Sequence, residues 1–75
     1  MPLSMAGIGE AKEVVRINGK DEVQRHLNHL GFVEGSKVTV VSELAGNLIV
    51  HVKDMRVAID RTMANRIIAV SYTHL

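Results

Sequence analysis

Three short segments of alternating apolar and polar residues, joined by very short connections, place the strongest limit on how this chain folds. The segments lie at 37–44, 48–53 and 56–60, and the connections are formed by Ala45-Gly46-Asn47 and Asp54-Met55. Alternation with period two is typical of a strand with one buried face. Strands joined by two or three residues pair as antiparallel neighbours. The sequence therefore predicts an antiparallel meander of three strands.

The same alternation predicts which side chains of the meander face the core. Residues two apart lie on the same face of a strand, so each segment contributes one apolar row. Ser42 interrupts the row of the first segment. The predicted inward set is Val38, Val40, Leu44, Leu48, Val50, Val52, Val57 and Ile59.

A helix is predicted at about residues 21–30, before the meander. Asp21 is a suitable N-cap, and Gln24 stands three residues later, which is the spacing of a capping box. The apolar residues recur at i, i+4 and i+7 and form one stripe. Gly31 suits the left-handed position at which many helices end. The stripe consists of Val23, Leu27 and Leu30.

Two further strands are expected outside the meander, at Ala11–Ile17 and Ile67–Val70, with a polar helical turn at Arg61–Asn65 between the meander and the last strand. Leu3 and Ile8 are candidate anchors for the first residues. Five short strands with tight turns are typical of a small barrel, which limits exposed strand edges. The predicted fold class is therefore mainly β, a five-strand barrel with one inserted α-helix. Two inward sets fit the last strand, Ile67 with Ala69 or Ile68 with Val70.

Composition narrows the functional classes. The 75 residues contain no cysteine, which excludes disulfides, thiolate zinc sites and cysteine nucleophiles. A formal net charge of +1 and only two aromatic residues, Phe32 and Tyr72, disfavour nucleic-acid binding. No apolar run approaches the roughly 20 residues of a membrane span, so direct membrane insertion is not expected. The missing disulfides favour a cytoplasmic location.

No catalytic constellation is visible in the sequence. The carboxylates of Glu34, Asp54 and Asp60 stand near turns, and no spacing pairs any two of them across a cleft. The serines lack a nucleophile-elbow context, and no glycine-rich phosphate loop is present. We therefore predict that the chain is not an enzyme and binds no organic cofactor.

Three histidines are candidate metal ligands. His26 and His29 stand three residues apart on the predicted helix, a spacing that can present two imidazoles to one ion. His51 lies on the outer face of a predicted strand, where Glu43 is a candidate partner. No third ligand lies near the helical pair in sequence. We therefore interpret all three as surface histidines and assign no metal site, while weak transition-metal binding stays open.

Apolar residues at the predicted hairpin tips are candidates for contact with a protein partner. Leu44, Leu48 and Met55 lie at or beside these tips, where either partner contact or local packing would explain them. Arg56 and Arg61 belong to a group of basic residues in the second half of the chain that would suit an acidic protein surface. These five residues are the predicted partner-binding set, and weak self-association stays open.

An ordered series of motifs resembles the FeoA family, the small cytoplasmic proteins of bacterial ferrous iron uptake. The series covers residues 2–70 and consists of Pro2-Leu3, the strand that ends at Ile17, Leu27-Asn28-His29-Leu30-Gly31-Phe32-Val33-Glu34-Gly35, Val38-Thr39-Val40, Gly46-Asn47-Leu48-Ile49-Val50-His51-Val52, Arg56-Val57-Ala58-Ile59-Asp60 and Met63-Ala64 with Ile67. The resemblance implies an SH3-like barrel with an inserted helix. It also implies a role beside the FeoB membrane GTPase and iron permease.

The chain departs from the family pattern at two places. The hairpin tip Leu44-Ala45-Gly46-Asn47-Leu48 lacks the usual prolines, and residues 71–75 have no counterpart and resemble a cloning or assembly remnant. We therefore expect one domain at 1–70 and a tail at 71–75. The alternative function is a stand-alone SH3-like regulatory domain, similar to the C-terminal domain of iron-dependent repressors, that binds protein segments or a transition metal.

Overall fold

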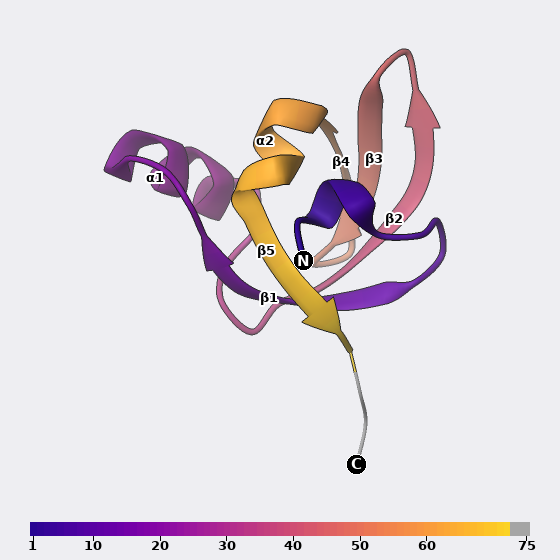
Figure 1. The fold of residues 1–75 in the computed structure, drawn as a ribbon, viewed down its shortest axis with the longest axis horizontal. Coiled ribbons are helices and arrows are strands. Elements are labelled where there is room, and N and C mark those ends of the chain that lie inside the picture. Colours follow the sequence, from indigo (N-terminus) through magenta and orange to yellow (C-terminus); the bar gives the residue numbers. More distant parts are fainter. Residues whose placement is uncertain (73–75) are drawn as a thin grey trace.

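The computed structural model describes residues 1–72, and Figure 1 shows the order of the elements. Five strands and two short helices follow a single turn of 3-10 helix. The elements are η1 (Leu3–Met5), β1 (Ala11–Ile17), α1 (Asp21–His29), β2 (Lys37–Leu44), β3 (Asn47–Val52), β4 (Met55–Asp60), α2 (Arg61–Arg66) and β5 (Ile67–Ser71). Neither helix is long and apolar enough to span a bilayer within this described part of the chain.

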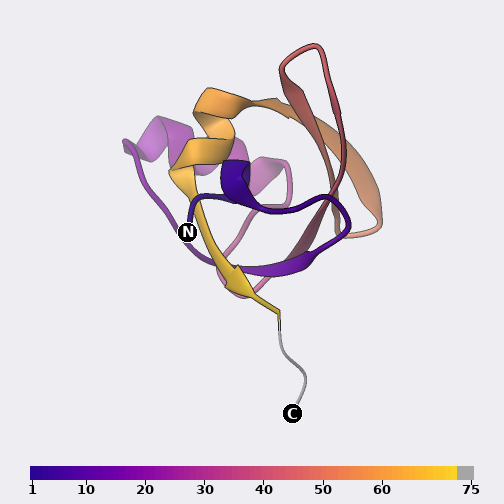
Figure 2. The same cartoon turned by 45° about the vertical axis from the view of Figure 1, so that its right-hand side comes forward.

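The strands form one antiparallel sheet in the order β4-β3-β2-β1-β5. The sheet curls around the core, as Figure 2 shows. This confirms the predicted meander and the mainly β fold. The hydrogen-bonded ladder has β4 and β5 as its two edges, and α2 connects them. The free side of β5 is covered by Met1, which exchanges two backbone hydrogen bonds with Ala69, and by a bridge from Pro2 to Ile68.

Two register shifts change which residues face the core. In β2 the shift lies between Val40 and Ser42, so the residues after it fall on the opposite face from the one that alternation predicts. The prediction that Leu44 faces inward is therefore wrong, and its side chain is 70% exposed. In β1 the shift lies between Val14 and Arg16 and places Ile17 opposite the buried Ile67.

Both hairpin connections are two-residue turns with positive φ at both positions. Ala45 and Gly46 have φ of 52° and 83°, and Lys53 and Asp54 have φ of 49° and 63°. Such turns match the right-handed twist of the flanking strands. The second connection lies one residue earlier than predicted, because Met55 already pairs with Val52 as the first residue of β4.

The N-terminus of α1 differs from the predicted capping box. Lys20 occupies the N-cap position with extended backbone, and Asp21 is the first helical residue. The side chain of Gln24 instead donates from Nε2 to the carbonyl of Gly19, at 3.0 Å. Asp21 and Glu22 still lie in the first turn, where their negative charge interacts favourably with the helix dipole.

The end of α1 confirms the apolar stripe. Leu27 is fully buried, while Val23 and Leu30 are half-buried against the core. Gly31 has φ of 105°, and Phe32 then turns back, with its amide donating to the carbonyl of Leu27 at 3.0 Å. The completely or nearly buried core is Leu3, Val14, Leu27, Phe32, Val38, Val40, Leu48, Val50, Val52, Ile59, Ala64, Ile67 and Ala69.

The ends of the chain correct two predictions. Leu3 is buried as expected, but Ile8 is 65% exposed and does not anchor the first residues. The last strand extends one residue beyond its predicted end at Val70, since Ser71 belongs to β5, and the amide of Tyr72 donates to the carbonyl of Ala11. Residues 73–75, the rest of the predicted tail, lie outside the described residues.

The last strand resolves the choice that the sequence left open. Ile67 and Ala69 are buried, whereas Ile68 is half-buried and Val70 is exposed. The pairing of β5 with β1 fixes this choice, since Ala69 lies opposite the buried Val14 and Ile67 lies opposite Ile17. The helix α2 leads into the strand, and its N-cap Asp60 accepts a hydrogen bond from the amide of Met63 at 2.8 Å.

Candidate functional site

The exposed members of the predicted partner-binding set lie at two separate places on the molecule. Leu44 ends β2 at one end of β3, and Met55 begins β4 at the other end. The two positions lie opposite Asn47 and Val52, and five residue steps of about 3.3 Å separate them by roughly 17 Å. Met55 is 49% exposed. The tip residues therefore do not form one patch.

Leu48 belongs to the core and not to a surface. Its side chain is 3% exposed, and it lies opposite Ile59 on the inner side of the sheet. Of the two explanations that the sequence left open for this residue, the structure shows local packing. Leu48 faces inward, as the alternation predicts, because β3 begins at Asn47, so its side chain is not exposed at the tip.

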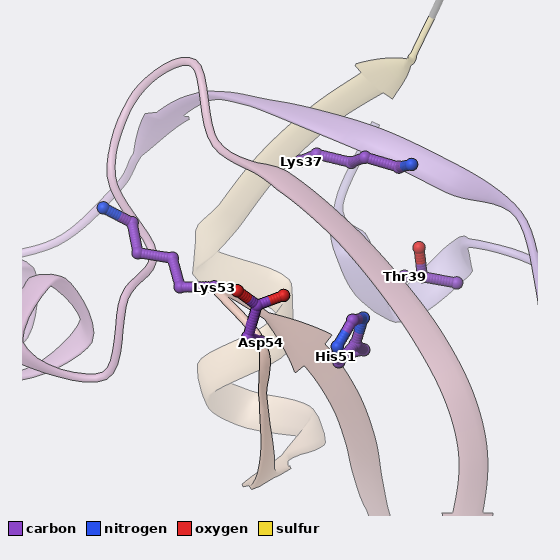
Figure 3. Close-up of a pocket in the computed structure, with 5 residues that line it drawn as sticks. All are labelled: Lys37, Thr39, His51, Lys53 and Asp54. Atoms are coloured by element: carbon purple, nitrogen blue, oxygen red, sulfur yellow. The ribbon is translucent and has the colours of Figure 1, made fainter.

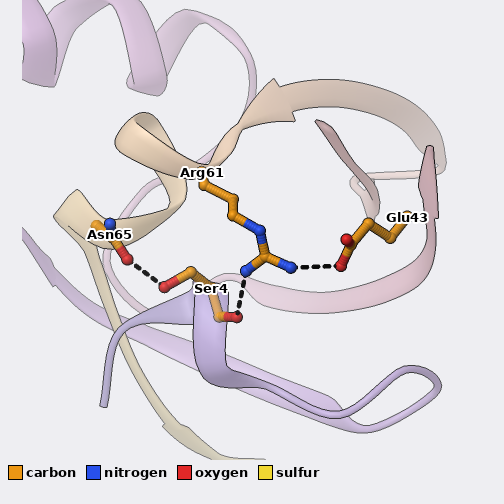
Figure 4. A network of polar contacts seen from close by, with 4 residues as sticks. All are labelled: Ser4, Glu43, Arg61 and Asn65. Atoms are coloured by element: carbon orange, nitrogen blue, oxygen red, sulfur yellow. Dashed lines mark hydrogen bonds and ion pairs between the residues drawn. The ribbon is translucent and has the colours of Figure 1, made fainter. Parts of the chain in front are cut away.

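Arg61 links three elements beside the β2–β3 hairpin, as Figure 4 shows. Its Nη2 donates to Oε2 of Glu43 at 2.5 Å, and its Nη1 donates to the carbonyl oxygen of Ser4 at 3.5 Å. The hydroxyl of Ser4 in turn donates to Oδ1 of Asn65. We call Leu44 and this network the hairpin-tip surface. Since an exposed ion pair contributes at most about 1 kcal/mol, the network positions Arg61 more than it stabilises the fold.

The other surface lies on the outer face of β2, β3 and β4. Thr39, His51 and Arg56 are direct cross-strand neighbours there. An open pocket of about 360 Å³ surrounds the first two, and Figure 3 shows its side chains. The pocket is lined by Lys37, Thr39, His51, Lys53 and Asp54.

A second open pocket of about 380 Å³ lies between α1, β1 and the segment after α1. Arg16 and Glu34 bring opposite charges to it, and Gln24 and Asn28 contribute amides from the helix. Sequence reasoning missed both pockets. Each combines residues from segments that are distant in sequence, and only strand register or helix docking brings them together.

The three candidate histidines do not meet. His26 and His29 are exposed on the last turn of α1, and His51 is exposed on the outer face of β3. Within residues 1–72, no group of three or more histidine, aspartate or glutamate side chains is arranged to hold a metal ion. Glu43 does not lie beside His51, because it sits opposite Leu48 and binds Arg61.

A comparison with models of known protein families shows which family has this fold and sequence. The FeoA domain model matches residues 1–70, which is nearly all of the described fold. The chain belongs to the FeoA family. FeoA is a family of non-catalytic accessory domains linked to ferrous iron transport, so the prediction that the chain is not an enzyme is confirmed.

Solved FeoA proteins share the whole fold. One, an iron uptake regulatory protein, is 31% identical over 95% of both chains, with a TM-score of 0.87. FeoA of Chlorobium tepidum is 27% identical over 97% of this chain and 71% of its own, with a TM-score of 0.88. FeoA of Stenotrophomonas maltophilia, a prokaryotic SH3 domain protein solved with zinc, is 28% identical over 93% and 89%, with a TM-score of 0.81. These matches confirm the SH3-like fold.

A manganese-dependent transcriptional repressor shares the fold as well. It is 24% identical over 96% of this chain and 41% of its own, with a TM-score of 0.85. No curated protein matched the chain.

The double variant His26→Ala/His29→Ala tests the interpretation of the helical histidines. We expect an unchanged thermal melt, because both side chains are exposed, and an unchanged titration with ferrous ion under anaerobic conditions. His51→Ala serves as the matched control on the sheet. A large loss of ferrous-ion affinity in the double variant alone would contradict the interpretation and identify a site on α1.

Proposed function

We propose that this FeoA protein acts in the cytoplasm and binds a FeoB-type membrane GTPase and iron permease, whose activity it modulates. The observation that carries the proposal is the family match over residues 1–70. Relatives of similar length share the full fold, including one that is an iron uptake regulatory protein. A direct role in nucleic-acid binding is not part of the proposal, because the net charge is only +1.

The hairpin-tip surface is the part of the molecule that best suits docking to a large protein. The β2–β3 hairpin projects beyond the rest of the sheet in Figure 1. Leu44 places an apolar side chain at its tip, and the preceding residue, Glu43, holds Arg61 of α2. Arginine is enriched at protein interfaces and among their energetically dominant residues, so Arg61 is the candidate anchor of this surface, and Leu44 adds exposed apolar area at the tip.

Modulation of the transporter requires unequal binding to two of its states. A ligand that binds both states equally shifts no equilibrium, however tightly it binds. We therefore expect the affinity of this chain to differ between the nucleotide-free, GDP and GTP states of the transporter.

Titration of the labelled chain against the transporter's purified cytosolic domain and the intact transporter tests the proposal. We expect saturable binding whose dissociation constant changes with the bound nucleotide. Leu44→Asp is expected to weaken binding by about tenfold, which corresponds to about 1.4 kcal/mol. Val70→Asp is the control, because Val70 is an exposed apolar residue on β5, away from the hairpin. Absence of binding in every nucleotide state would contradict the proposal.

The alternative is a regulatory domain that binds protein segments, which the shared fold with the manganese-dependent repressor favours. Gene context separates the two functions. A permease gene beside this one supports transport, and a repressor gene fused upstream supports regulation.

A further inference from the structure

Three basic side chains surround the pocket on the outer face of β2–β4. Lys37 and Lys53 line it, and Arg56 lies directly across from His51 in the adjoining strand. In Figure 3 the two lysine ammonium groups extend in different directions, so their charges flank the pocket and do not meet in it. We call Lys37, Thr39, His51, Lys53 and Arg56 the basic face.

The positive charges of this face are poorly compensated within the fold. Two ion pairs are formed by side chains of residues 1–72, Lys12 with Glu10 and Arg61 with Glu43. Lys53 and Arg56 therefore have no ion-pair partner in the described part of the chain. Two carboxylates lie nearby, since Asp54 lines the pocket and Glu13 is the cross-strand neighbour of Lys37.

The neutral groups between the charges are suited to hydrogen bonding. The hydroxyl of Thr39 and the imidazole of His51 are direct neighbours in the strand register and line the same pocket. Both can donate to a carboxylate oxygen. The pocket is open, so it offers a surface for a segment of chain and does not enclose a small molecule.

We infer that the basic face binds an acidic, extended segment of a protein partner. In an extended chain alternate side chains point to the same side, so alternating aspartate or glutamate residues would present their carboxylates to Lys37, Lys53 and Arg56 together. One aromatic ring among the described residues adjoins the basic face, that of Tyr72, which lies 5.3 Å from the Lys37 ammonium group. A protein segment is favoured over a nucleic acid because proteins that bind single strands stack successive bases on several aromatic side chains, and this face offers a single ring that Lys37 already covers. The inference deepens the proposed function and rests on it for the partner, whose cytosolic part would carry the segment.

Fluorescence anisotropy with a short labelled peptide of alternating glutamate and serine tests the inference on the full chain. The matched peptide carries glutamine in place of glutamate. We expect saturable binding of the acidic peptide alone. The binding should weaken as ionic strength rises from about 0.01 M to about 0.15 M, since the Debye length falls from about 30 Å to about 8 Å. Equal binding of both peptides would overturn the inference.

Charge reversal locates the site. Lys53→Asp/Arg56→Glu is expected to weaken peptide binding by about tenfold, or about 1.4 kcal/mol. Aspartate suits position 53 because it tolerates the positive φ of that turn residue. The control Lys20→Asp/Arg25→Glu makes the same change in net charge at two exposed positions, the N-cap and the middle of α1. Equal weakening by both variants would overturn the location.

Asp54→Asn provides a test in the opposite direction. Removing this carboxylate from the pocket is expected to strengthen peptide binding by about two- to fivefold. The reason is that the substitution removes the repulsion between Asp54 and the carboxylates of the peptide, which is an exposed charge–charge interaction. Unchanged or weaker binding would overturn the placement of the peptide carboxylates over the pocket. Tighter binding of a single-stranded oligonucleotide than of the acidic peptide would overturn the choice of a protein partner.

The same variants separate failure of this inference from failure of the proposed function. If the transporter's cytosolic domain binds Lys53→Asp/Arg56→Glu as well as the unaltered chain, the proposed function stands and the basic face is not its docking site. If the acidic peptide binds this face but the transporter binds nowhere, the inference about the surface stands and the proposed partner is wrong.

Discussion

Leu27→Ala is expected to lower the free energy of unfolding by about 2–5 kcal/mol, through lost burial and the cavity left behind. Leu27 is fully buried and is the centre of the apolar stripe of α1. A domain of this size has roughly 4–11 kcal/mol of stability in total, so the substitution removes a large share of it. Thermal unfolding measures the effect, at about 4–8 °C for each kcal/mol.

Leu44→Ala is the matched control for this experiment. It removes the same atoms from a side chain that is 70% exposed at the tip of the β2–β3 hairpin. We expect a change within about 0.5 kcal/mol, because little buried surface is lost. Equal effects of the two substitutions would contradict the helix register, since the register alone makes Leu27 inward and buried.

Phe32→Ala is expected to cost about 3–5 kcal/mol. Phe32 is the largest fully buried side chain of the described fold, and its amide also closes the C-terminal turn of α1 through the carbonyl of Leu27. The substitution leaves that backbone hydrogen bond possible but empties the space between the helix end and the sheet. Unfolding in urea, followed in parallel by circular dichroism and by amide hydrogen exchange, measures the loss.

Val33→Ala is the control, because Val33 is the next residue and is only half-buried. We expect its cost to be well below that of Phe32→Ala, since less apolar surface leaves contact with the core. A coincident loss of helix and sheet in Phe32→Ala would show that the residue joins both into one cooperative unit. Loss of stability in α1 alone, with the sheet unchanged, would contradict that role.

The local sequence pattern was sufficient to predict most of the strands and the helix α1. The meander follows from short alternating segments and two-residue turns, and α1 follows from the spacing of Val23, Leu27 and Leu30. These signals depend on neighbours within a few residues, which is the range that sequence periodicity reports. The predicted capping box does not form, because Lys20 and not Asp21 is the N-cap and Gln24 bonds to Gly19, two residues before the predicted cap.

The exposure of side chains at the tip of the β2–β3 hairpin could not be predicted from the local sequence pattern. Alternation places Leu44 inward, but the extra residue at the register shift in β2 reverses the faces of everything after it. Leu48 faces the core opposite Ile59, as the alternation predicts, because the pairing of β3 with β4 contains no shift. A shift of one residue is invisible in a pattern of period two until the partner strand is in place.

The two candidate surfaces also could not be predicted from the sequence, because their residues meet only in the folded protein. Arg61, Glu43 and Ser4 come from three elements, and each looks like an ordinary polar residue in the sequence. Thr39, His51 and Arg56 become neighbours only through the register of three strands.

The sequence by itself determined that this protein is a small β-rich domain with one amphipathic helix, without cysteine chemistry and with the ordered motifs of the FeoA family. Only the tertiary structure decided that Leu44 is exposed, and that the hairpin-tip surface and the basic face lie apart. The physical reason is the distance along the chain over which each feature is set. Side-chain periodicity is set within a strand or a helix turn, whereas a surface is set by the register between strands that are far apart in the chain.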